Sequence, residues 1–120
     1  MWETFDKRKF PRLRVKCDVL VKEQNSPNVF TTETENIGAG GICVFLDKSL
    51  MPFSPVSLKL ELEDNLSIPL ECTGKIVWCI RNQTLHHDKT RFDIGIEFMN
   101  IKTEDRERIR RFIQERIASV

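Results

Sequence analysis

Two arginines near the start of the chain have the chemistry to hold an anionic ligand. Arg8 and Arg12 are separated by three residues within the basic segment KRKFPR of residues 7–12, where Pro11 limits the shapes the backbone can adopt. A guanidinium group can form two parallel hydrogen bonds with a phosphate or with the O6/N7 edge of guanine. The segment therefore predicts a site for a ligand that carries phosphate or guanine groups.

A second candidate group is the glycine-rich stretch that follows Asn36. Gly38, Gly40 and Gly41 fall within four residues, and an apolar run follows them. Such a turn exposes backbone N–H groups with no Cβ in the way, and the Asn36 amide can both donate and accept hydrogen bonds. Asn36, Gly38 and Gly41 therefore join the two arginines as candidate ligand-binding residues.

Residues typical of catalysis or metal binding are sparse. The histidines, His86 and His87, are adjacent in a polar stretch and have no accompanying carboxylate pair. The chain has four widely spaced cysteines, which are Cys17, Cys43, Cys72 and Cys79. None belongs to a CxxC pair, and each lies in an apolar run. We therefore expect no enzyme, no metal site and no cofactor, and we interpret the cysteines as reduced core residues of a cytoplasmic protein.

Size and charge narrow the possible partners. The chain has 120 residues, of which 40% are hydrophobic and 31% charged, as is typical of one folded domain. No apolar run approaches the roughly 20 residues of a membrane helix, so we expect no membrane insertion. A formal net charge of +1 with a local basic cluster favours a small anionic ligand over a nucleic acid polymer. A solvated basic strand edge is the alternative interpretation of the cluster.

Apolar alternation predicts strands over most of the chain. Residues 1–11 show neither alternation nor a helical pattern, and we expect them to form an arm. Alternating or β-branched segments follow at about residues 13–21, 29–35, 42–46, 56–62, 68–80 and 92–98. The long run at 68–80 keeps its apolar residues at one parity. It therefore predicts a bent strand with Gly74 at the bend or in a bulge.

The end of the chain has a helical pattern instead. Thr103 can cap a helix that begins with acidic residues, which are favourable at the positive helix end. Apolar residues at helical spacing continue this helix over about residues 103–118. The sequence therefore predicts an all-β-dominated fold in a single domain over residues 12–120. Its six strand-like segments predict an antiparallel β-barrel or a strongly curved sheet, followed by a C-terminal α-helix.

Taken together, the two candidate segments resemble the PilZ domain family, bacterial receptors for the second messenger cyclic di-GMP. The family's RxxxR motif is matched by Arg8 to Arg12, and its [D/N]xSxxG motif by Asn36 to Gly41, with Gly38 where serine is usual. The segments GKIVW at 74–78 and GIEF at 95–98 are similar to the family's later barrel strands. The resemblance extends from about residue 7 into the terminal helix.

The resemblance implies that the fold is a six-stranded antiparallel β-barrel with a C-terminal α-helix. It also implies a cyclic di-GMP receptor or adaptor rather than an enzyme. It implies that Arg8 and Arg12 hold guanine and phosphate groups, while Asn36 and the turn to Gly41 contact another guanine or the ribose–phosphate ring. Ligand binding would order the arm of residues 1–11. The ordered arm would then alter a contact with a protein partner or the oligomeric state.

Gly38, which stands where the family usually has serine, is the reason to consider a second function. The missing hydroxyl removes a net of about 0.5–1.5 kcal/mol, whereas an arginine–guanine contact is worth about 1–3 kcal/mol, so we expect weakened binding. The alternative is a PilZ-like protein-interaction module that no longer binds the dinucleotide. A third class, a barrel that binds single-stranded nucleic acid, expects exposed aromatic platforms, but the phenylalanines mostly share the core parity.

Overall fold

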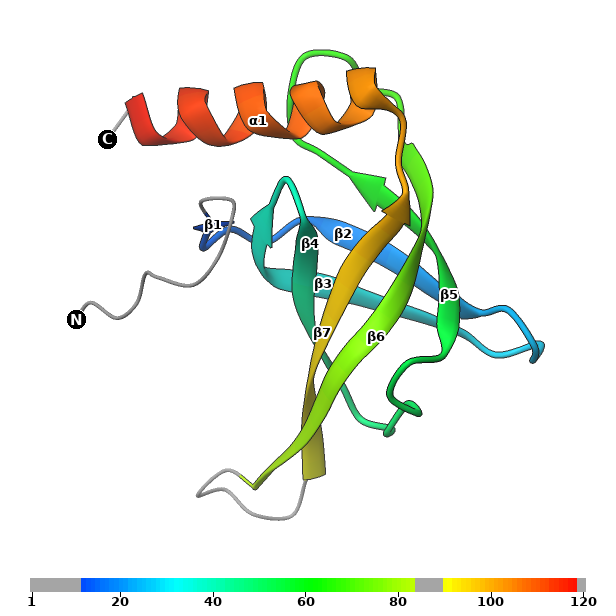
Figure 1. The fold of residues 1–120 in the computed structure, drawn as a ribbon. Helices are drawn as coiled ribbons and strands as arrows, with labels where there is room; N and C mark the ends of the chain where they lie inside the picture. Colours follow the sequence, from blue (N-terminus) through cyan, green and yellow to red (C-terminus); the bar gives the residue numbers. More distant parts are fainter. Residues whose placement is uncertain (1–11, 84–89, 119–120) are drawn as a thin grey trace.

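A computed structural model describes residues 12–83 and 90–118 of the chain (Figure 1). These ranges contain seven strands and one helix. They are β1 (Arg12–Leu13), β2 (Asp18–Glu23), β3 (Val29–Gly38), β4 (Gly41–Leu46), β5 (Pro55–Glu61), β6 (Leu70–Gln83), β7 (Thr90–Asn100) and α1 (Thr103–Ala118). The predicted arm with Arg8, and both histidines, lie outside the described residues.

Six of the described strands close into an antiparallel barrel. Their order is β3-β2-β5-β6-β7-β4, and β4 pairs back with β3, so each of the six has a neighbour on both sides. All of these pairings are antiparallel. The predicted six-stranded barrel with a C-terminal helix is thereby confirmed, and closure removes the exposed sheet edges.

The first predicted strand, at residues 13–21, is interrupted. Both β1 and β2 pair with the edge of β3 that faces away from β4, but residues 14–17 between them leave the ladder. The Thr34 hydroxyl bonds to two backbone groups in this interruption. It accepts a hydrogen bond from the Cys17 amide (2.9 Å) and donates one to the Val15 carbonyl (2.6 Å). Thr34 is buried, so its hydroxyl satisfies backbone groups that water does not reach.

Alternate strand residues fill the barrel interior. The buried apolar side chains include Val19, Val21, Ile42, Val44, Leu58, Leu60, Ile76, Ile94 and Ile96. Helix α1 adds Ile109, Phe112 and Ile113 to the same core, and Figure 1 shows the helix lying across one end of the barrel. The apolar stripe predicted for this helix is therefore what closes that end.

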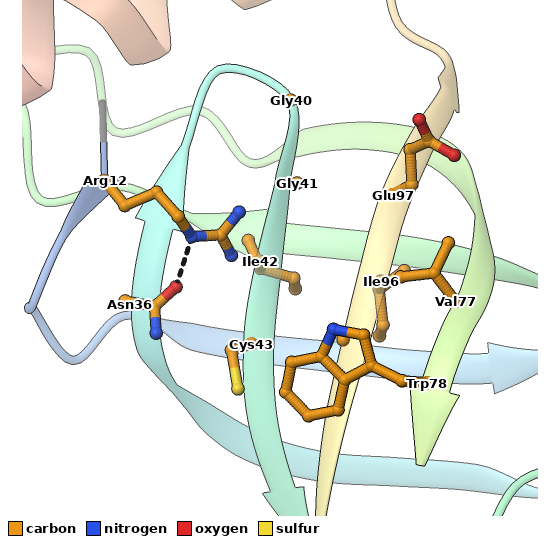
Figure 2. A pocket seen from close by; sticks show the side chains of 11 residues that line it. Arg12, Asn36, Gly40, Gly41, Ile42, Cys43, Val77, Trp78, Ile96 and Glu97 are labelled. Carbon is orange, nitrogen blue, oxygen red and sulfur yellow. Dashed lines mark hydrogen bonds between the residues drawn. The ribbon is translucent and has the colours of Figure 1, made fainter. Parts of the chain in front are cut away.

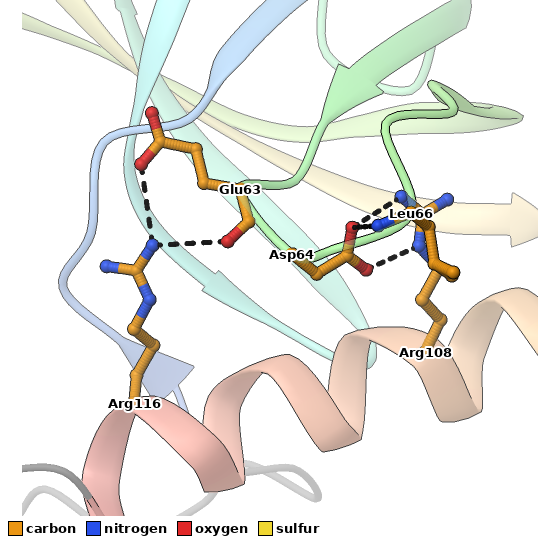
Figure 3. A network of polar contacts seen from close by, with 5 residues as sticks. All are labelled: Glu63, Asp64, Leu66, Arg108 and Arg116. Carbon is orange, nitrogen blue, oxygen red and sulfur yellow. Dashed lines mark hydrogen bonds and ion pairs between the residues drawn. The ribbon is translucent and has the colours of Figure 1, made fainter.

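A buried ion pair fastens the helix to the loop between β5 and β6. The Arg108 guanidinium donates from Nε to Asp64 Oδ2 (2.7 Å) and from Nη2 to Oδ1 (2.9 Å), as Figure 3 shows. The two side chains are only 8% and 12% exposed. Arg116, about two turns further along the helix, makes a weaker and more exposed contact with Glu63 at 3.4 Å. The fork geometry of the first pair sets where the helix lies on the barrel.

Candidate ligand-binding site

A pocket of about 450 Å³ opens on the outer face of the barrel wall (Figure 2). Residues from five strands that are distant in the sequence line it. They are Arg12, Asn36, Gly40, Gly41, Ile42, Cys43, Val77, Trp78, Gly95, Ile96 and Glu97. Of the candidates predicted from the sequence, the structure therefore brings Arg12, Asn36 and Gly41 together in one place.

Strand register arranges some of these residues in a row across the wall, which we call the upper row. Arg12 pairs with Gly38, Gly38 with Gly41, and Gly41 with Glu97. Neighbouring strands lie about 4.8 Å apart, so the two ends of the row are roughly 14 Å apart. The row thus has a long basic side chain at one end, a carboxylate at the other and two glycines between them.

A second row, the lower row, runs beside the first. Asn36 pairs with Cys43, Cys43 with Gly95, and Gly95 with Trp78. This row also has its larger side chains at the ends and its small residues in the middle. The two rows therefore form a trough, whose floor is β4 and β7 and whose sides are Arg12 with Asn36 and Trp78 with Glu97.

Alternation along the strands places both rows on the outer face. Ile42 and Ile96 point into the barrel and are fully or almost fully buried. Because side chains alternate between the two faces of a strand, Gly41, Cys43, Gly95 and Glu97 face outward. Cys43 was predicted as a core residue, but it lies under the trough instead of inside the barrel.

Arg12 and Asn36 are in direct contact. Arg12 Nε donates a hydrogen bond of 2.7 Å to Asn36 Oδ1, and Figure 2 shows the guanidinium pointing toward β4. An amide oxygen fixes the orientation of the guanidinium without contributing a negative charge. Asn36 therefore orients the Arg12 guanidinium.

The parity predicted for the long strand was wrong beyond Ile76. The register with β7 shifts between Ile76 and Trp78, so Val77 is an extra residue and the following side chains change faces. Trp78 and Ile80 are consequently 38% and 57% exposed, although the sequence pattern placed them in the core. The predicted irregularity at Gly74 is confirmed, since a separate shift falls between Thr73 and Gly74.

The indole of Trp78 is packed against the backbone of β7. A Cβ added to Gly95 would lie only 2.3 Å from the Trp78 ring, so glycine is what allows the ring to approach the strand so closely. The ring is thus held at one side of the trough. An aromatic face beside a basic side chain is the arrangement with which proteins stack and hold nucleotide bases.

At the glycine turn, the group that approaches the backbone closely is another strand of the barrel, β7. A Cβ at Gly41 would lie 2.2 Å from the Ile96 carbonyl oxygen of β7, and the Phe98 amide donates to the Gly40 carbonyl at 2.9 Å. No described glycine has a positive φ. Gly41 therefore has a structural role in closing the barrel, apart from any contact with a ligand.

Other chemistry finds no support in the part of the chain that the structure describes. Within residues 12–83 and 90–118 no group of three or more metal-ligating side chains occurs, and no helix there is long and apolar enough to cross a membrane. None of the four cysteines, all of which are described, forms a disulfide. Burial raises the pKa of Cys17 and raises that of Cys72 to about 11, so both thiols are protonated and unreactive at neutral pH.

Comparison with known protein families shows which family the sequence resembles. The sequence model of the PilZ domain matches residues 6–115, which is most of the chain and includes both candidate motifs. No curated protein matches the chain.

Several solved structures share the fold at low sequence identity. The inhibitor of motility MotI/DgrA from Bacillus subtilis is 19% identical with a TM-score of 0.76, over 95% of this chain and 53% of that chain. MrkH from K. pneumonia, in a complex with c-di-GMP, is 16% identical with a TM-score of 0.76, over 94% and 52%. The PilZ domain of YcgR from Escherichia coli, with c-di-GMP, is 12% identical with a TM-score of 0.70, over 94% and 95%. This chain spans about half the length of the first two proteins and nearly all of the third.

Proposed function

This chain belongs to the PilZ domain family, and on that basis we propose that it is a cyclic di-GMP-binding receptor that acts as an adaptor without catalytic activity. The observation that carries the proposal is the trough, in which Arg12 and Asn36 from the two sequence motifs face Trp78 across β4 and β7. Two of the structurally similar proteins, MrkH and the YcgR domain, have been determined with c-di-GMP.

Each side of the trough offers a different interaction to a guanine dinucleotide. The Arg12 guanidinium can bind a phosphate or the O6/N7 edge of a guanine, with Asn36 holding its orientation. The Trp78 ring offers a stacking face, which is worth about 1–3 kcal/mol per base. The pocket volume of about 450 Å³ lies within the range of about 300–1,000 Å³ that is usual for small-ligand sites.

We propose a signalling mode in which the ligand connects the arm to the barrel. Arg8 is four positions before Arg12, so a ligand held by both arginines would fix residues 1–11 against the wall beside β3 and β4. The fixed arm would then change a contact with a protein partner or the oligomeric state.

Calorimetric titration with cyclic di-GMP tests the proposed function directly. We expect a saturable heat of binding, and light scattering of the same samples would report a change of oligomeric state. The absence of any heat at high micromolar ligand would rule out the receptor function. That result would favour the alternative, an interaction module that has lost the dinucleotide, for which the missing serine at Gly38 is the motivating observation.

Arg12→Ala is expected to weaken cyclic di-GMP binding by about 5- to 150-fold, because it removes a contact worth about 1–3 kcal/mol. The measurement is the dissociation constant from the same titration. Arg111→Ala is the matched control, since it removes an exposed arginine of α1. Equal affinities for wild type and Arg12→Ala, with unchanged thermal unfolding, would remove Arg12 from the site.

Gly38→Ser is expected to bind the dinucleotide as well as wild type or up to about tenfold more tightly, since it restores a hydroxyl worth about 0.5–1.5 kcal/mol. The backbone permits the change, because Gly38 has no positive φ. Titrating both proteins under one condition gives the ratio of affinities. A clear loss of affinity in Gly38→Ser would show that the site requires glycine there.

A further inference from the structure

Glu97 is the one carboxylate among the described residues that line the trough. It lies on β7 at the end of the upper row opposite Arg12, and Figure 2 shows it across β4 from the guanidinium. Gly41 pairs directly with it, and a Cβ at Gly41 would lie 3.1 Å from the Glu97 Cα. The glycine turn of the second motif is therefore what brings this carboxylate to the site.

The Glu97 carboxylate has no polar partner among the residues that the structure describes. Within residues 12–83 and 90–118 it makes no hydrogen bond and no ion pair. Its charged cross-strand neighbour is Lys75 on β6, which is not within ion-pairing distance. The side chain is exposed and is free to meet a ligand.

A carboxylate is out of place in a site that binds only phosphate, because like charges repel. It suits a site that also reads the Watson–Crick edge of guanine. That edge presents N1–H and the N2 amino group side by side, and the two carboxylate oxygens can accept from both. Adenine presents an acceptor at N1 instead, and hypoxanthine keeps N1–H but lacks the amino group.

The position of Glu97 relative to Trp78 fits this role. Trp78 packs over Gly95, and Glu97 is two residues further along the same strand, about 6.7 Å away. Both residues lie on the outer face of the wall, so a base stacked on the indole can extend one edge along β7 toward Glu97. Arg12 and Asn36 lie on the opposite side of the trough, where the phosphates and the O6/N7 edge can be held.

We propose that Glu97 selects guanine, by accepting hydrogen bonds from N1–H and the N2 amino group of a base stacked on Trp78. This inference rests on the proposed receptor function and adds to it a residue that determines base specificity. In this arrangement Arg12, at the basic end of the upper row, holds the anion, and Glu97, at the acidic end, identifies the base.

The test compares three cyclic dinucleotides, which carry guanine, hypoxanthine or adenine, on wild type and on Glu97→Gln. In wild type we expect the hypoxanthine analogue to bind at least about tenfold more weakly than the guanine ligand, because a hydrogen bond to a charged group is lost. In Glu97→Gln we expect weaker binding of the guanine ligand and a guanine-to-hypoxanthine ratio within about threefold. Glu61→Gln, an exposed glutamate on β5, is the matched control.

The ratio of affinities separates this proposal from the receptor function on which it rests. If wild type binds no cyclic di-GMP, the receptor function and the role of Glu97 are both overturned. If wild type binds and the guanine-to-hypoxanthine ratio is the same in Glu97→Gln, only the role of Glu97 is overturned. Tighter binding of all three ligands by Glu97→Gln would also overturn it, since that is the result expected of a carboxylate that merely repels phosphate.

Discussion

Replacing Asp64 with alanine is expected to lower the free energy of unfolding by about 3–5 kcal/mol. The change leaves the Arg108 guanidinium, whose side chain is only 8% exposed, without the carboxylate that receives both of its hydrogen bonds. A domain of this size has a total stability of about 5–15 kcal/mol, so the loss is a large fraction of the whole. Urea unfolding followed by circular dichroism measures the difference.

Two further variants identify the cause of that loss. Glu63→Ala removes the partly exposed pair with Arg116 and should cost only about 0–1 kcal/mol. The double variant Asp64→Ala with Arg108→Met removes both charges and should be more stable than Asp64→Ala alone, because no unpaired charge remains buried. A double variant that is less stable than Asp64→Ala would contradict this account.

The same pair predicts how stability depends on pH. Hydrogen bonds from Arg108 are the main cause of the lowered pKa of Asp64, and they outweigh the opposing effect of burial. A carboxyl group with a lowered folded-state pKa contributes stability above its unfolded pKa of about 3.9, and this is lost as pH falls through the folded value. Wild type should therefore lose stability in acid below about pH 4 more steeply than Asp64→Ala does.

The fold could be predicted because its signals are local. Alternation of apolar residues needs only a few neighbouring positions, and six such strands with no helix between them indicate an antiparallel barrel or a strongly curved sheet. The family resemblance favoured the closed barrel. The interruption at residues 14–17 was not visible, because it depends on the Thr34 side chain, which is 17 positions from Cys17. The Asp64–Arg108 pair, 44 positions apart, was hidden for the same reason.

The candidate site could be predicted only on its basic side. Arg12 and Asn36 were found because they belong to short motifs whose residue types suggest binding. Trp78 was missed because Val77 is an extra residue in the strand. A one-residue shift moves each following side chain of β6 to the other face of the sheet. No local sequence pattern marked Glu97 as a site residue, because its place in the site depends on the register between β7 and β4.

The second large effect is expected at Gly41. Gly41→Ala should lower the free energy of unfolding by about 3 kcal/mol, the upper end of overpacking costs, because its Cβ would lie 2.2 Å from the Ile96 carbonyl oxygen. That oxygen belongs to the backbone of β7, so no change of rotamer can relieve the collision. The pairing of β4 with β7, which closes the barrel beside the site, would have to shift.

Gly95→Ala provides the comparison that separates a structural glycine from one that serves the site. Its Cβ would collide with the Trp78 ring, a side chain that can turn away, so we expect a small change in stability and a clear loss of cyclic di-GMP affinity. Urea unfolding and titration of both variants give the two readouts. If Gly41→Ala were as stable as wild type and lost only affinity, Gly41 would act through the ligand and not through closure of the barrel.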